Sequence, residues 1–292
     1  MTRLFLVAGT TASGKTEFAI DFAQKNNCEI LSCDASAFYK GMDIGTAKPS
    51  LEERQQISHW GIDLIHPNEN FSIQHYVSYM QSCVEEIIQK GKNVLVVGGS
   101  GFYLKAFLEP VVDTVTPSEE VKQKIDQLEQ QKGFHGIVET LLSINSDLPP
   151  NFDLNNPRKV RKALERCWTT GESLVSLYES FKHQEKPFAN LKKEAYYLIC
   201  PPEILKLRIA KRTQQMLRKG LIDEVQNLLD KHYLIPGMPA ASAIGYRETI
   251  HFLQHPNTFD LESTINKNTF TLAKKQMTWF RHQICFDRYI FN

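Results

Sequence analysis

The sequence predicts an α/β protein in which a parallel sheet carries helices on both faces and is interrupted by an all-helical insertion. Strand-like and helix-like segments alternate through the first third of the chain. Helical periodicity alone continues from about residue 113, until an apolar run at 194–200 indicates a late strand of the same sheet. We therefore expect a core of residues 1–112 and 194–292, and a helical insertion domain of residues 113–193.

Each element is predicted from its apolar pattern and its flanking turn residues. The run Val-Leu-Val-Val at 94–97 is continuous, as expected of a central parallel strand that is covered on both faces. Helices are predicted where apolar residues recur every three or four positions. The predicted strands span 4–8, 29–32, 62–65, 93–97 and 194–200; the core helices span 16–24, 73–89, 101–107, 203–219, 221–231, 245–253 and a C-terminal stretch to about 288; the insertion helices span 119–131, 134–142, 157–169 and 174–181.

Residues 9–16 form a complete phosphate loop (P-loop) of the pattern G-x-x-x-x-G-K-T, between a predicted strand and a predicted helix. Its backbone N–H groups and the helix N-terminus suit phosphate oxygens. Lys15 is expected to reach the outer phosphates, and Thr16 to offer its hydroxyl to Mg²⁺. The core is thus predicted to be P-loop NTPase-like and to bind a phosphate or diphosphate, although the pattern does not specify ATP. The loop residues are Gly9, Thr10, Thr11, Ala12, Ser13, Gly14, Lys15 and Thr16.

Polar residues follow the predicted strands, where ligands bind in open α/β sheets. Asp34 ends the second strand, and its carboxylate is predicted to be a general base or an indirect metal ligand, or else a helix cap. Ser100 lies in the glycine-rich turn after the fourth strand and is predicted to hydrogen-bond in the site or to cap a helix. Arg208 and Arg212 lie one helical turn apart and suit a departing phosphate, with solvated charges as the alternative.

Composition limits the functional classes. A net charge of +1 argues against a generally cationic protein, so any nucleic-acid contact must use local patches. Basic residues at 158–162, and basic and aromatic residues at 274–281, fit single-stranded RNA or ordinary amphipathic helices. The six cysteines include no C-x-x-C pair, which indicates reduced thiols. No apolar stretch is long enough to span a membrane, so we expect no membrane partner. Unpaired cysteines fit a cytoplasmic protein, and we expect it to be a monomer.

A string at 39–49, Tyr-Lys-Gly-Met-Asp-Ile-Gly-Thr-Ala-Lys-Pro, predicts an ordered loop beside the site; its composition fits a lid, a polyanion contact or a solvated loop. Together with the strings at 9–16, 98–103, 155–165, 245–248 and 273–281, it resembles the bacterial tRNA dimethylallyltransferase family over essentially the whole chain. The resemblance implies transfer of the dimethylallyl group from dimethylallyl diphosphate to N6 of adenosine 37 in the tRNA anticodon stem-loop.

The resemblance also implies residue roles. Asp34 would take a proton from the adenine amine, and Ser100, where the family usually has Thr, would orient the reacting groups. Lys15, Thr16 with Mg²⁺, and Arg212 would stabilise the departing pyrophosphate, with Arg208 in a lesser role. The insertion would bind the anticodon arm. The residues implied to contact tRNA are Asp34, Ala35, Ser36, Ala37, Ser100, Lys122, Arg158, Lys159, Val160, Arg161, Lys162, Ser242, Ala243, Ile244, Gly245, Tyr246, Arg247, Lys274, Lys275, Gln276, Met277, Thr278, Trp279, Phe280 and Arg281.

Some residues depart from the family pattern. Ala35 and Ala37 are shorter than the side chains usual there, Lys122 and Lys275 stand for Arg, and Phe270 replaces a common Arg. Each change removes a hydrogen bond or a bidentate geometry. We expect an altered tRNA preference, or a paralogue with a changed substrate, with the chemistry retained.

Two alternatives fit part of the sequence. A P-loop small-molecule kinase would bind ATP, but it leaves the string at 39–49 and the helical insertion unexplained. A non-catalytic RNA-binding protein would not need the complete phosphate loop or Asp34.

Overall fold

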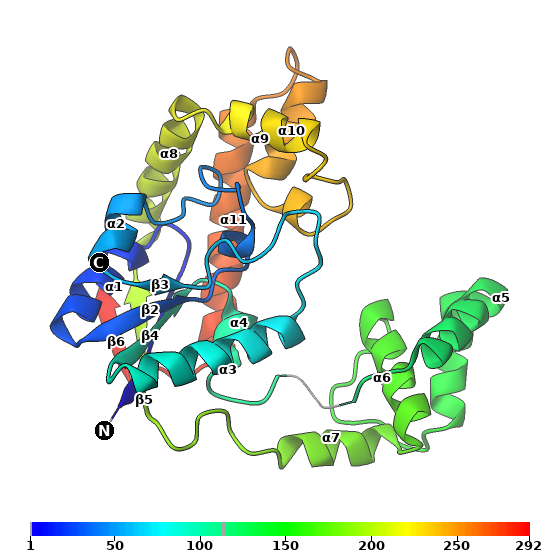
Figure 1. Ribbon diagram of the computed structural model, residues 1–292. Coiled ribbons are helices and arrows are strands. Elements are labelled where there is room, and N and C mark those ends of the chain that lie inside the picture. Colours follow the sequence, from blue (N-terminus) through cyan, green and yellow to red (C-terminus); the bar gives the residue numbers. More distant parts are fainter. Residues whose placement is uncertain (1, 112–114) are drawn as a thin grey trace. The chain divides into compact units, whose positions relative to one another are not determined.

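The computed structural model describes residues 2–111 and 115–292, and it confirms the predicted α/β architecture. The strands of the described chain form one sheet in the order β3-β2-β4-β1-β5-β6, and every pairing is parallel (Figure 1). β4 and β1 lie at its centre, as the apolar run at 94–97 predicts. The strands are β1 (Arg3–Gly9), β2 (Cys28–Ser32), β3 (His59–Trp60), β4 (Asn93–Gly98), β5 (Lys192–Ile199) and β6 (Arg288–Phe291).

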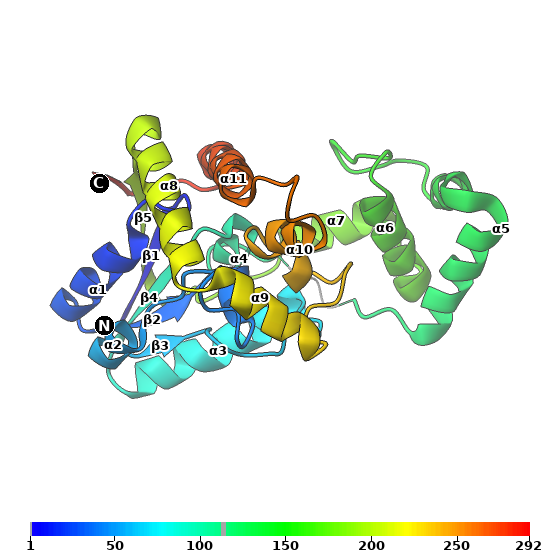
Figure 2. The same ribbon diagram turned by 90° about the horizontal axis from the view of Figure 1, so that it is seen from above.

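Both faces of the sheet are covered by helices (Figure 2). Along β1, Phe5 and Val7 pack in one cluster with Ala19 and Ala23 of α1 (Lys15–Lys25). Successive strand residues point to opposite faces, and the alternating residue Leu6 is equally buried. The connection from β1 to β2 and the connection from β3 to β4 cross the sheet in opposite directions. Because parallel crossovers are right-handed, the two connections cover opposite faces, and α3 (Ile73–Gln89) therefore lies on the face opposite α1.

The structure differs from the sequence predictions at β3, at the C-terminal end and at one short helix. The strand expected at 62–65 is the two-residue β3 instead, and Ile65 makes only an isolated bridge with Tyr39. The C-terminal helix, expected to reach about 288, ends at Gln283, and the chain then adds β6 beside β5. The helix ends there because Ile284 adopts an extended conformation. The short helix α2 (Leu51–Gln56) was missed, although Ser50 and Glu53 form the capping box that announces it.

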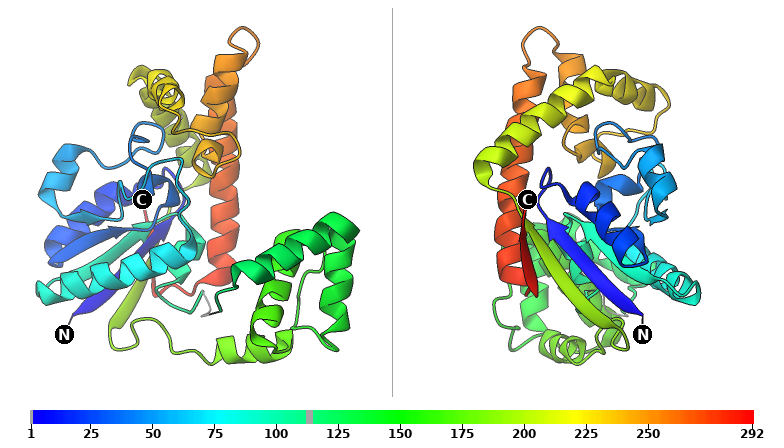
Figure 3. Two further views of the ribbon diagram at one scale, coloured as in Figure 1. Left: turned by 45° about the vertical axis from the view of Figure 1, so that its right-hand side comes forward. Right: turned by 90° about the vertical axis from the view of Figure 1, so that its left-hand side faces the viewer.

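The remaining core helices enclose the carboxyl edge of the sheet. α8 packs against α11 through Leu205, Ile209 and Ala273 (Figure 3). A second cluster, which includes Met42, Val225 and Ile265, joins the 39–49 loop to the other helices. These elements are α4 (Gly101–Lys105), α8 (Pro202–Arg218), α9 (Leu221–Asp230), α10 (Tyr246–Gln254), α11 (Leu261–Gln283) and the 3₁₀ helices Ala35–Phe38 and Ala240–Ser242.

The chain divides into two compact units, Met1–Glu109 with Phe188–Asn292, and Pro110–Pro187. The expected boundary at 112–113 lies outside the described residues. The second unit is helical and contains α5 (Glu119–Ser143), α6 (Pro157–Thr170) and α7 (Leu174–Lys182). Gly133, with a φ of 63°, divides α5 into the two predicted segments. None of the described helices combines the length and apolar character that crossing a membrane requires.

Candidate active site

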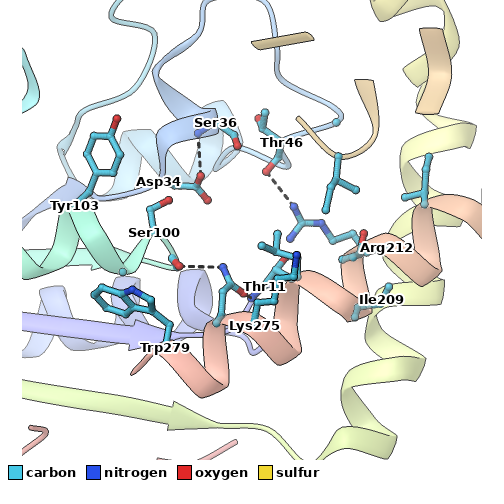
Figure 4. Close-up of a pocket in the computed structure, with 18 of the residues that line it drawn as sticks. Thr11, Asp34, Ser36, Thr46, Ser100, Tyr103, Ile209, Arg212, Lys275 and Trp279 are labelled. Carbon is cyan, nitrogen blue, oxygen red and sulfur yellow. Dashed lines mark hydrogen bonds between the residues drawn. The ribbon is translucent and has the colours of Figure 1, made fainter. Parts of the chain in front are cut away.

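A cavity of about 500 Å³ lies where the strands of the core unit end (Figure 4). One side is polar and is formed by Thr11 of the phosphate loop, Asp34 after β2, and Ser100 after β4. Arg212 of α8 enters from the helices. The opposite wall is largely apolar, which gives the cavity room for both a charged group and a hydrocarbon group. The apolar wall includes Phe102, Ile209, Met216, Ile244, Leu272 and Trp279.

The phosphate loop adopts the geometry that its glycines permit. Gly14 lies at the start of α1 with a φ of 87°, a left-handed conformation that favours glycine. The Lys15 ammonium donates to the carbonyls of Gly9, at 3.0 Å, and Thr10, at 2.6 Å. Burial lowers the pKa of Lys15 to about 8, while the charge of Asp34 raises it and the charge of Arg212 lowers it. A half-buried ammonium with such neighbours is suited to receive an anionic ligand.

Asp34 and Ser100 meet at one point of the cavity wall. Oδ1 of Asp34 accepts a hydrogen bond from the Ser36 backbone N–H at 3.0 Å, so Asp34 caps the short 3₁₀ helix and also lines the cavity. Ser100 Oγ accepts from the Ala35 N–H at 3.2 Å and makes no capping bond to α4, although it occupies the N-cap position. The capping alternative therefore holds for Asp34 without removing it from the cavity, whereas it does not hold for Ser100.

Arg212 and Arg208 are not solvated helix charges. Arg212 Nη2 donates to the Thr46 carbonyl at 3.0 Å. Burial lowers the pKa of the Arg212 guanidinium, and the charge of Asp34 opposes that shift. Arg208 Nη1 is buried, has no hydrogen-bond partner among the described residues, and lies 3.3 Å from where a Cβ on Gly14 would be. Both guanidinium groups therefore face the phosphate-loop region.

Gln276 of α11 links two parts of the site, and no pattern in the sequence indicates this link. Its Oε1 accepts from the Thr11 N–H at 2.8 Å, and its Nε2 donates to the Gly99 carbonyl at 2.9 Å. A Cβ on Gly99 would lie 2.7 Å from Gln276 Nε2, and a Cβ on Gly101 would clash with the Trp279 ring. The glycine-rich turn after β4 thus makes room for α11, and Gly99 and Gly101 also line the cavity.

The 39–49 loop is fixed from within. Lys48 is buried, and its ammonium donates to the Tyr39 carbonyl at 2.6 Å and pairs with Asp43 and Asp63 at 2.7 and 2.6 Å. This lysine therefore ties the two ends of the loop to each other and to Asp63. Gly45 and Thr46 of the same loop line the cavity.

The residues expected to contact tRNA differ in their exposure to solvent. Lys274, Lys275, Thr278 and Arg281 are exposed along α11. Ser242 and Arg247 are exposed near α10. Four of the expected contact side chains are buried, and one of them, Phe280, also lines the main cavity. The four are Ala37, Val160, Tyr246 and Phe280.

Within the helical unit, the basic residues at 158–162 divide into two groups. Arg158 and Lys159 are exposed. Arg161 is held by the carboxylates of Asp126, Glu129 and Glu165 at 2.5, 2.8 and 3.2 Å, and Lys162 also pairs with Glu165. Lys122 pairs with Glu119 at 2.5 Å.

Comparison with known proteins places the chain in a family. A sequence model of the family described as IPP transferase matches residues 37–283. The tRNA dimethylallyltransferase of Opitutus terrae is 43% identical over 283 residues, covering 97% of this chain and 91% of that protein. That of Caldicellulosiruptor saccharolyticus is 32% identical over 282 residues, covering 96% and 89%.

A solved structure supports the same assignment. The tRNA isopentenylpyrophosphate transferase of Bacillus halodurans superposes with a TM-score of 0.70 at 28% identity, covering 100% of this chain and 90% of that one. The chain therefore belongs to the tRNA dimethylallyltransferase family and is an enzyme that transfers a dimethylallyl group to tRNA.

Proposed function

We propose that the cavity holds dimethylallyl diphosphate and the flipped base of adenosine 37 together, and that it joins the prenyl group to N6 of that base. One observation carries the proposal: a single cavity brings together a phosphate-loop residue, a carboxylate, a guanidinium and an apolar wall. The reaction needs a loop and a cation to hold the diphosphate, a carboxylate to accept the proton, and an apolar wall for the prenyl chain. These four surfaces must lie next to one another. The kinase alternative accounts for the loop but not for the apolar wall.

The donor would lie with its diphosphate on residues 9–16 and its hydrocarbon against the apolar wall. Breaking the allylic C–O bond leaves negative charge on pyrophosphate, and that charge must be neutralised where it develops. Lys15 and Arg212 are placed for this role, since both are half-buried cations that line the two cavities. Arg208 adds an unpartnered N–H close to Gly14.

The acceptor base would enter the same cavity after leaving its stack, which is how enzymes reach an atom inside a folded nucleic acid. Trp279, Tyr103 and Phe102 offer aromatic faces there. The N6 amine attacks the allylic carbon, the bond to the diphosphate oxygen breaks, and the amine loses a proton. Asp34 would accept that proton, because the Ser36 N–H occupies Oδ1 and leaves Oδ2 available.

A magnesium ion fits the residues beside the phosphate loop. A smaller cavity of about 90 Å³ is lined by Lys15, Thr16, Ser32 and Asp34. Mg²⁺ prefers oxygen ligands and is commonly held by one or two protein oxygens together with phosphates. The Thr16 hydroxyl would hold the ion, and the ion would neutralise part of the diphosphate charge. No group of three or more His, Cys, Asp or Glu side chains in the described residues forms a metal cage, and this arrangement needs none.

The helical unit, Pro110–Pro187, is proposed to bind the anticodon arm of the tRNA. Its exposed cations Arg158 and Lys159 suit the phosphate backbone. Exposed residues of α11, such as Lys274 and Arg281, would do the same in the core unit. We propose that the enzyme acts as a monomer in the cytoplasm.

The decisive assay supplies labelled dimethylallyl diphosphate and unmodified tRNA to the purified chain, and in parallel labelled ATP with candidate metabolites. We expect label in tRNA, recovered as N6-dimethylallyladenosine after digestion, and release of pyrophosphate. Phosphorylation of a metabolite without labelling of tRNA would favour the kinase alternative.

Asp34→Asn tests the mechanism within that assay. We expect the single-turnover rate to fall by about 10²–10⁴-fold, the usual contribution of a general base, with little change in donor affinity. Glu52→Gln, an exposed carboxylate on α2, is the matched control and should leave the rate unchanged. A wild-type rate for Asp34→Asn would remove this carboxylate from the mechanism.

A further inference from the structure

Glu224 of α9 holds one loop by three consecutive backbone groups. Its Oε2 accepts hydrogen bonds from the N–H groups of Asp43, at 3.0 Å, and Ile44, at 2.9 Å, and its Oε1 accepts from Gly45 at 3.2 Å. The Tyr246 hydroxyl donates to the same Oε1 at 2.6 Å. Three consecutive N–H groups that share one carboxylate form a strong and directional arrangement, because each bond is charge-assisted. The carboxylate therefore determines the path of the loop at 43–45.

Tyr246 is fixed as firmly as the loop. The Tyr246 side chain is fully buried, and burial raises its pKa, with the charge of Glu224 adding to the shift, so the hydroxyl remains a donor. A Cβ on Gly45 would clash with the Tyr246 ring, which explains why glycine occurs there. The α10 residue, the α9 carboxylate and the loop thus form one packed and hydrogen-bonded unit.

The residue that follows this unit contacts the site directly. Thr46 comes immediately after Gly45, and its carbonyl accepts the hydrogen bond from Arg212 Nη2 at 3.0 Å. Both Gly45 and Thr46 line the main cavity. A shift of the loop would therefore move the acceptor that orients the guanidinium, and small displacements of a charged group matter greatly for transition-state stabilisation.

We propose that Glu224 and Tyr246 are positioning residues that aim the Arg212 guanidinium at the departing pyrophosphate through the Thr46 carbonyl. This inference rests on the proposed function of Arg212. It assigns Tyr246 to the leaving-group side of the reaction, and not to contact with tRNA. It also gives Glu224 a role that its position in the sequence, on a helix after the last predicted strand, does not suggest.

The first experiment compares Tyr246→Phe and Glu224→Gln with Asp223→Asn. The Phe variant retains the ring beside Gly45 and removes only the hydroxyl, and Asp223 is an exposed carboxylate on the same helix. We expect the single-turnover transfer rate to fall by about 10- to 100-fold for either test variant, the range for losing a hydrogen bond to a charged group. Affinity for tRNA should stay within about twofold. The control should match the wild type.

The second experiment is a double-mutant cycle with Arg212→Lys, because residues that act through one another show non-additive effects. In the Arg212→Lys background, Tyr246→Phe should cause little further loss of rate. A full additional loss, or a loss of tRNA affinity as large as the loss of rate, would show that Tyr246 and Glu224 serve general folding or tRNA binding. If Arg212→Lys alone retains the wild-type rate, the proposed function of Arg212 fails, and the positioning role fails with it.

Discussion

The surroundings of Lys15 disfavour the positive charge of its ammonium. Its ammonium is turned onto two loop carbonyls, burial opposes its protonation, and a second cation, Arg212, acts in the same direction. The nearby carboxylate of Asp34 compensates only in part. Binding of a diphosphate would relieve this conflict, because the ligand brings the negative charge that the site lacks.

This conflict predicts a pH dependence of donor binding. The pKa of Lys15 is lowered from 10.5 to about 8, so the free enzyme loses this proton as the pH rises through about 8. The protonated form attracts the diphosphate, and therefore the dissociation constant of dimethylallyl diphosphate should increase above that pH, by up to about tenfold per pH unit. Calorimetric titration without tRNA measures it. Lys15→Arg, whose guanidinium does not titrate, should give a flat profile, and a flat wild-type profile would contradict the assignment.

Among the elements, α11 is the one that connects the donor side of the site with the surface expected to meet tRNA. Gln276 faces inward to the Thr11 N–H and the Gly99 carbonyl, while Lys274 and Lys275 on the same helix are exposed. One helix thus presents cations to solvent and, through Gln276, hydrogen-bonds the phosphate loop in the interior.

Removing that brace should measurably destabilise the protein. Gln276→Met leaves the Thr11 N–H and the Gly99 carbonyl without partners, and we expect a loss of about 1–3 kcal/mol in the free energy of unfolding together with weaker donor binding. Lys267→Met places the same side chain at an exposed position of α11 and should change neither quantity. Denaturant titration and donor titration are the two measurements. Equal stability of the two variants would show that the bridge contributes nothing.

The elements also show what sequence reasoning can reach. The phosphate loop, the central strands and the break of α5 at Gly133 could be predicted because each depends on neighbouring residues. β6 could not, since a short strand is defined by its pairing with β5 and not by its own pattern. The bonds of Gln276 to the Thr11 N–H and of Glu224 to the loop N–H groups were equally inaccessible, because these partners lie more than a hundred residues away in the chain.

At the scale of the whole molecule, the structure separates paired cations from exposed ones, and the sequence does not show this distinction. Some cations of this near-neutral chain, such as Lys48 and Arg161, are held in ion pairs with little exposure to solvent. In the helical unit, the Arg161 guanidinium binds three carboxylates, one of them on the buried residue Glu165. Only geometry could separate this structural cation from its exposed neighbours, because a run of basic residues reads the same in either case.

This division predicts opposite outcomes for neighbouring residues. Replacing Arg158 and Lys159 with Ala should weaken tRNA binding and reduce the slope of log K against log salt by about 0.7–0.9 for each phosphate that is no longer neutralised, since fewer counterions are released. Arg161→Ala should leave that slope nearly unchanged but destabilise the chain, because the buried Glu165 would lose one of its two cationic partners. Fluorescence anisotropy at several salt concentrations and thermal unfolding separate the two effects. A slope that changes for Arg161→Ala and not for the double variant would reverse the assignment and place the RNA backbone against the buried pair.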